Sequence, residues 1–183
     1  MLAAAPALAP AATASSSAEE SLEIVLPTKQ MDLKTFESLA DTHMSEPEWT
    51  VALTVVAFAT YPKNKELALK MLEILRGPAG LSASDKKFIS DRFLDKDYVP
   101  RSYFKGATPD NDYTPGEPPT IRVSRHRHSY SREGIADLWL HSGGADSPRP
   151  ASVRKAKDGK WYLWNYNSIL LSIRIPESQN PWQ

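Results

Sequence analysis

Hydrophobic residues in the first half of the chain recur every three or four positions, the spacing that places them on one face of an α-helix. Four such segments follow one another between residues 32 and 96, and the second, residues 49–61, is apolar on almost every side. A helix without a polar face is a buried one. The pattern therefore predicts about four short helices, with residues 49–61 at the centre of the core.

Residues typical of helix ends separate these segments. Asp32 and Ser82 can each cap the helix that follows them. Ser45 and Glu48 have the spacing of a capping box just before the apolar segment. The Gly-Pro pair at residues 77–78 ends the third segment, because Gly favours a left-handed backbone and Pro cannot continue the helix.

After residue 119 hydrophobic residues alternate with polar ones, as in strands with one buried face. Strand character is found at residues 121–124, 136–141, 151–153, 161–166 and 170–175. Asp158 and Gly159 predict a two-residue hairpin turn in which both residues take positive φ. Helices first and hairpin-linked strands second indicate an α+β fold, an N-terminal bundle of about four short helices packed on a C-terminal antiparallel β-sheet of four to five strands.

The beginning of the chain differs in composition from the rest. Residues 1–21 are mainly Ala, Pro and Ser and are predicted to form a disordered tail or linker, and residues 22–183 a single α+β domain. Residues 12–14 resemble a leader cleavage site, but a leader needs a positive first region and an unbroken apolar stretch, which Pro6 and Pro10 interrupt. We therefore expect a cytoplasmic protein, and a longer N-terminal region stays open.

Composition and charge exclude several classes of protein. The chain of 183 residues has 22 Lys and Arg against 22 Asp and Glu, and no Cys. A net charge of zero argues against general nucleic-acid binding, and the lack of Cys excludes thiol nucleophiles and Cys-ligated zinc. No stretch approaches the ~20 apolar residues of a membrane span. Phosphate-loop, nucleophile-elbow and zinc-protease motifs are absent, and we expect no cofactor.

Two segments rich in Pro and Gly carry the most unusual sequence. Residues 99–119 form a long irregular connection, a kind of segment that is commonly functional. Within it residues 101–115 follow the pattern RSYFxGATPxNxYTP, and residues 142–150 read SGGADSPRP. With the surrounding residues, from about 26 to 176, these motifs resemble a bacterial family of uncharacterised proteins, a domain of unknown function. The resemblance implies a single bacterial domain and supplies no reaction, cofactor or catalytic residue.

Both motifs combine Arg with Asp or Asn, whose side chains make directed hydrogen bonds beside a backbone fixed by Gly and Pro. Seven of their residues are ligand-binding candidates: Arg101, Tyr103, Asn111, Tyr113, Asp146, Ser147 and Arg149. The alternative is that Asp146 and Arg149 hold a tight turn and that the tyrosines pin the loop to the core. Because both segments connect to one sheet, we expect the two motifs to lie close together.

A short basic segment carries a possible metal pair. His126 and His128 would project from the same side of a strand, where two imidazoles can chelate one metal ion. A third ligand is not evident and nearby arginines would repel a cation, so a solvated basic strand edge is favoured and no metal is expected. Residues 122–132 with Tyr130 could contact a phosphate backbone, but this segment is short and nucleic acid is an unlikely partner.

One predicted strand carries two tryptophans. Trp161 and Trp164 face opposite sides because side chains alternate along a strand. One is expected in the core and the other outside, where an exposed indole can anchor a contact.

The sequence favours a non-enzymatic binding or protein-interaction module whose partner is an unknown protein or a small anionic ligand. The alternative is a small hydrolase-like or lyase-like enzyme in which Asp146 acts as a base, Arg101 or Arg149 holds an anionic substrate, and a nearby His moves a proton. An enzyme would bring these groups together in a concave pocket, whereas a binding module would not.

Overall fold

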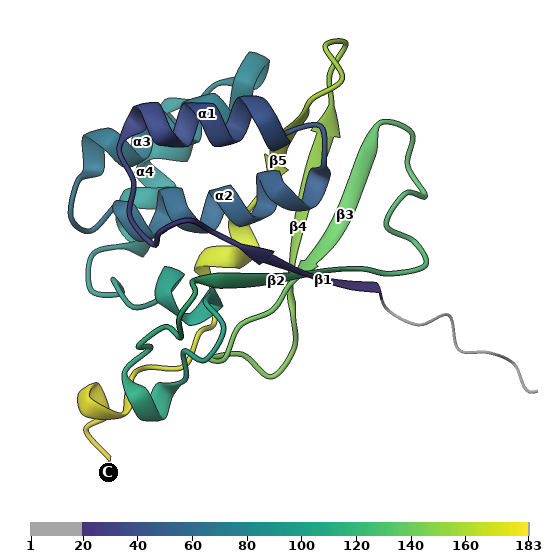
Figure 1. Ribbon diagram of the computed structural model, residues 1–183. Helices are drawn as coiled ribbons and strands as arrows, with labels where there is room; N and C mark the ends of the chain where they lie inside the picture. The colour runs from purple at the N-terminus through teal and green to yellow at the C-terminus, as the bar shows by residue number, and fades with distance from the viewer. Residues whose placement is uncertain (1–19, 183) are drawn as a thin grey trace, which may run out of the picture.

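The computed structural model describes residues 20–182 (Figure 1). Within these residues the α-helices are α1 Leu33–His43, α2 Pro47–Thr60, α3 Lys65–Arg76 and α4 Ala83–Arg92. The strands are β1 Glu20–Val25, β2 Thr120–Arg125, β3 Ile135–Leu140, β4 Arg149–Lys155 and β5 Trp161–Asn165. Short 3-10 helices connect them: η1 Gly77–Ala79, η2 Pro100–Tyr103, η3 Pro109–Asn111, η4 Asn167–Leu170 and η5 Glu177–Gln179.

The strands of the described chain form one antiparallel sheet in the order β1-β2-β3-β4-β5. β2 and β3 share a short stretch of pairing, Val123 with Leu140 and Ser124 with Trp139. In Figure 1, β1 and β2 run across the direction of the other strands, and the helices gather on one side of the sheet. The predicted α+β fold, with helices first and strands second, is confirmed.

Helix α2 is the centre of the hydrophobic core, as its sequence predicts. Every residue from Val51 to Phe58 is buried. The helix contacts α1 and α3 as well as every strand of the sheet, so apolar side chains on all its sides are covered at once. Among residues 20–182, no helix combines the length and the apolar character that crossing a bilayer requires.

The prediction of a strand at residues 170–175 is wrong. The chain leaves η4 as irregular backbone, and Ser172 has a φ of 55°, which a strand does not allow. The carbonyl groups of Leu171 and Ser172 accept hydrogen bonds from the Arg149 side chain instead of from a neighbouring strand. An apolar run therefore packs here without strand geometry.

Strand β1 is the one that the sequence pattern does not predict. It pairs with β2 along its whole length, with the buried Ile24 opposite Ile121. Leu22, Glu23 and Ile24 alternate, but a strand of six residues gives too short a pattern to mark it. Residues 1–19 of the predicted tail lie outside the described residues, and residues 20–21 begin β1.

Helix α2 begins without the predicted capping box. Its N-cap residue is Glu46, whose side chain makes no capping hydrogen bond. Glu48 is buried and faces Arg125 of β2, so its carboxylate does not turn back to the helix end. The other two predicted caps form, Asp32 before α1 and Ser82 before α4.

The β4–β5 hairpin forms where the sequence predicts it, but its turn is of another kind. Of the two central residues, Gly159 alone has a positive φ, 85°, and Asp158 does not. The Ala156 N–H donates to the Lys160 carbonyl at 2.9 Å, and the Gly159 N–H donates to the Ala156 carbonyl at 3.1 Å. The connection is therefore a longer loop closed by one left-handed glycine.

Candidate functional site

The two sequence motifs, residues 101–115 and 142–150, lie side by side. The Gly143 N–H donates to the Ser102 carbonyl at 2.9 Å, and the Ser142 hydroxyl donates to the Ser102 hydroxyl at 2.7 Å. The predicted closeness of the two motifs is confirmed.

Two glycines explain how closely the motifs approach. A Cβ atom on Gly143 would overlap the carbonyl oxygen of Ala107, and one on Gly144 would overlap the Tyr113 hydroxyl. Residues with side chains do not fit at either position without a shift of the neighbouring loop. The glycine pair therefore has a packing role that requires no ligand.

The two candidate tyrosines anchor the first motif. The Tyr103 hydroxyl donates to the Ile169 carbonyl at 2.6 Å, and the Tyr113 hydroxyl donates to the Arg174 carbonyl at 2.6 Å. Both residues are buried, and burial raises the pKa of Tyr113 to about 12. Because each phenol already has a backbone partner, the two side chains hold the loop to residues 167–182, which we call the C-terminal segment.

Asn111 shapes the turn within the first motif. Its side-chain oxygen accepts from the N–H groups of Thr108 at 2.9 Å and Thr114 at 3.2 Å, and its amide donates to the Gly106 carbonyl at 2.8 Å. These bonds fix the backbone of the turn and leave Asp110 exposed at its tip.

The charged candidates do not share a partner. Each has its own: Arg101 with Asp97 at 3.1 Å, Asp146 with Arg174 at 3.1 Å, and Arg149 with the carbonyl groups of Ser147, Leu171 and Ser172. The Asp146 side chain is 92% exposed. An acid-base site would place its base, its arginine and its histidine around one pocket. Asp146 and Arg149 instead contact neighbouring residues of the segment 171–174 through different bonds, and Arg101 pairs separately with Asp97.

A groove of about 670 Å³ opens where the two motifs meet the C-terminal segment. We call it the motif groove; it is lined by Thr108, Pro109, Asp110, Gly143, Arg174, Ile175, Glu177 and Asn180. Ile175 is 43% exposed. Asp110 and Glu177 have no ion-pair partner among residues 20–182. The lining thus combines an exposed apolar side chain with two available carboxylates.

The two histidines follow the end of a strand, so the strand geometry predicted for them is wrong. β2 ends at Arg125, and His126 and His128 belong to the turn after it. Their ring centroids are 6.3 Å apart, and Arg127 Nε donates to His128 Nε2 at 2.8 Å. The guanidinium occupies a nitrogen that a metal ion would need. Residues 20–182 hold no group of three or more His, Asp or Glu side chains arranged for a metal.

An ion pair between the buried Glu48 and the partly exposed Arg125 takes the place of the capping box predicted for α2. Glu48 is 2% exposed, and its Oε1 accepts from Arg125 Nε at 2.5 Å. Arg125 also lies 3.2 Å from the Glu20 carboxylate, and its hydrogen bond to Glu48 raises the pKa of Arg125. The pair fastens the beginning of α2 to the end of β2. In the sequence, an acidic residue in the first turn of an apolar helix is compatible with such an ion pair and equally with a helix cap. The pattern alone does not distinguish the two.

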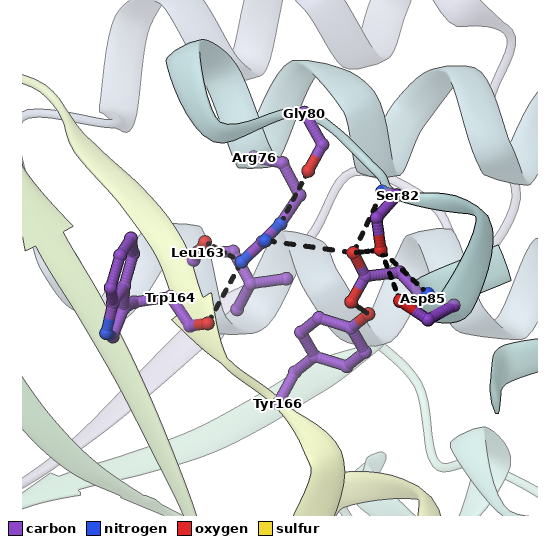
Figure 2. A network of polar contacts seen from close by, with 8 residues as sticks. Arg76, Gly80, Ser82, Asp85, Leu163, Trp164 and Tyr166 are labelled. Atoms are coloured by element: carbon purple, nitrogen blue, oxygen red, sulfur yellow. Dashed lines mark hydrogen bonds and ion pairs between the residues drawn. The ribbon is translucent and has the colours of Figure 1, made fainter.

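A second polar network fastens α4 to the sheet (Figure 2). The Asp85 carboxylate accepts from the Ser82 hydroxyl at 2.6 Å, from the Ser82 N–H at 2.9 Å and from the Tyr166 hydroxyl at 2.8 Å. Burial alone would raise the pKa of Asp85, but these hydrogen bonds outweigh it and lower the pKa from its ordinary value of 3.8. Burial and the contact with Asp85 raise the pKa of Tyr166.

We expect Asp85→Asn to lower the free energy of unfolding at pH 7 by about 1 to 2 kcal/mol, because three donors lose a charged acceptor. The folded pKa lies below the unfolded one, so the carboxylate stabilises the fold above about pH 4 and this contribution is lost as the pH falls through the folded pKa. The difference from the wild type should therefore shrink in urea unfolding at lower pH. Asp91→Asn, on the same helix and paired with Lys87, is the matched control and should change stability little. A pH-independent difference would contradict the role of the charge.

Comparison with known proteins gives a family without an assigned activity. A family model described as a domain of unknown function, DUF6935, matches residues 26–177. The match begins directly after β1 and includes both motifs. No curated protein and no solved structure matches the chain.

Proposed function

Because the chain belongs to the DUF6935 family of domains of unknown function, we propose a role from its surface: a non-enzymatic protein-interaction module that binds a partner through the motif groove. The observation that carries this proposal is the position of the groove. It opens where the two motifs meet, and both motifs contribute residues to its wall.

The chemistry of the groove favours a partner segment with an apolar side chain next to basic ones. Ile175 offers exposed apolar surface, and Asp110 and Glu177 offer carboxylates. The one cation of the lining, Arg174, already contacts Asp146. A Lys or Arg of the partner can pair with the carboxylates while its apolar neighbour covers Ile175.

The charged candidates have different interaction partners, and this supports binding over the enzyme alternative. That alternative requires Asp146, an arginine and a histidine within hydrogen-bond reach of one substrate. Asp146 instead pairs with Arg174 at the surface, and Arg101 and Arg149 have other partners. A small anionic ligand would also have to displace these contacts, whereas a protein segment can use the groove as it stands.

The experiment is crosslinking and affinity purification from cells that make the protein, with wild type, Ile175→Glu and Asp110→Lys compared. We expect the wild type to recover a partner that both variants recover at least about tenfold less, equivalent to a loss of about 1.4 kcal/mol of binding energy. Leu94→Glu is the matched control, because Leu94 is 81% exposed and lies outside the groove. Equal recovery of the partner by the wild type and all three variants would contradict the proposal. A chemical reaction that the wild type catalyses and that Asp146→Asn abolishes would instead favour the enzyme alternative.

A further inference from the structure

A second groove lies at the β4–β5 hairpin, and in Figure 1 the hairpin tip and the C-terminal segment are at opposite ends of the molecule. This hairpin groove has a volume of about 630 Å³. The turn after α3, residues 77–80, forms one wall with Pro78 and Ala79; we call this turn the corner after α3. The hairpin forms the other wall with Tyr162 and Trp164. The groove is separate from the motif groove and does not depend on the function proposed for it.

Arg76 holds the two walls together (Figure 2). Its Nε donates to the Gly80 carbonyl at 2.9 Å, and its Nη1 donates to the carbonyls of Leu163 at 3.1 Å and Trp164 at 2.9 Å. The guanidinium thus joins the corner after α3 to the edge strand β5. Because it occupies carbonyl groups of that edge, a partner cannot pair with them as an additional strand.

Gly77 brings the corner close to the hairpin. It has a φ of 49°, and a Cβ atom at this position would overlap the Tyr162 ring. The Tyr162 hydroxyl in turn donates to the Asp158 carboxylate at 2.6 Å. The walls are therefore set before any partner binds, which reduces the entropy lost on binding.

The groove combines an exposed indole with available cations. Trp164 is 42% exposed, whereas Trp161 of the same strand is 9% exposed, as their alternation predicts. The Arg154 guanidinium lies 4.8 Å from the centre of the Trp164 ring. Arg154, Lys155 and Lys157 have no carboxylate partner among residues 20–182.

We propose that the hairpin groove binds an acidic, extended segment of a partner protein. An apolar or proline side chain of that segment packs on Trp164, and its carboxylates pair with Arg154 and Lys157. Charge complementarity carries the choice of partner: the chain as a whole is neutral, but the charged residues lining this groove are mainly basic, Arg76, Arg154, Lys155 and Lys157 against Asp158. A nucleic acid fits less well, because a phosphate backbone is held by longer arrays of cations.

The experiment uses two matched pools of ten-residue peptides and the full chain. One pool carries a central Leu, Pro or Trp among Asp and Glu, and the other replaces every Asp and Glu by Asn and Gln. We expect the acidic pool to shift the Trp164 indole N–H signal in NMR spectra and to bind at least about tenfold more tightly than the amide pool, with weakening at high salt. Trp164→Ala and Lys157→Gln should each weaken binding severalfold.

Trp182→Ala is the control, because Trp182 is 90% exposed and lies outside the hairpin groove. It should leave binding unchanged. Lys157→Gln alters an exposed side chain of the hairpin loop and keeps the test valid if Trp164→Ala unfolds. The proposal is overturned if neither pool binds, if both bind equally, if both groove variants bind like the wild type, or if a single-stranded oligothymidylate binds more tightly than the acidic pool.

Discussion

Phe58→Ala should lower the free energy of unfolding by about 3 to 5 kcal/mol, through lost transfer energy and the cavity left behind. Phe58 is fully buried in α2, and its ring centre lies 5.8 Å from that of Tyr166 and 6.1 Å from that of Phe93. Tyr166 follows β5 and is held by its hydrogen bond to Asp85, and Phe93 ends α4, so we expect these neighbours to fill the space only in part. The loss approaches the whole stability of a typical domain.

Urea unfolding of the purified variant measures the effect. Leu94→Ala is the control, because Leu94 is 81% exposed and its truncation should change stability by less than about 0.5 kcal/mol. An unfolding midpoint of Phe58→Ala equal to that of the wild type would mean that α2 is not the centre of the core.

The second large effect is expected from the buried ion pair. Arg125→Leu leaves the Glu48 carboxylate without its guanidinium partner at 2% exposure, which should cost about 3 kcal/mol of stability. Replacing both residues by leucine removes the buried charge together with its partner. The double variant should therefore recover most of the loss, because a well-packed apolar pair can replace a buried ion pair.

A double-mutant cycle on Glu48 and Arg125 separates these contributions. The expected result is a double variant more stable than Arg125→Leu alone. Losses that simply add would contradict the assignment, since they would show that the two side chains stabilise the fold independently.

Much of the fold follows from local patterns in the sequence. The periodic apolar residues of α1 to α4 and the alternation of β2 to β5 are determined within a few residues, so they can be predicted from the chain itself. Strand β1 cannot, because its identity as a strand depends on pairing with β2, far away in the chain. The apolar run at residues 170–175 misleads for the opposite reason, since packing of η4 and the Arg149 contacts override its strand propensity.

The motifs were informative about position and less so about role. Their connection to one sheet predicts that they lie close together, and Gly143 and Gly144 allow the close approach that the structure shows. The partners of Arg149 could not be predicted, because backbone carbonyl groups leave no signature in a sequence. The two grooves likewise arise from surfaces brought together by the fold; in the sequence, the two motifs indicate the first groove and Trp164 indicates the second.

The pairing of β1 with β2 also determines when β1 can join the sheet during translation. Residues 20–25 are synthesised about 100 residues before their pairing strand, residues 120–125. At about 5 to 20 residues per second, the first strand waits on the order of 5 to 20 s for its neighbour. During that interval the helices α1 to α4 can form, so β1 can join the sheet only after all four have been synthesised.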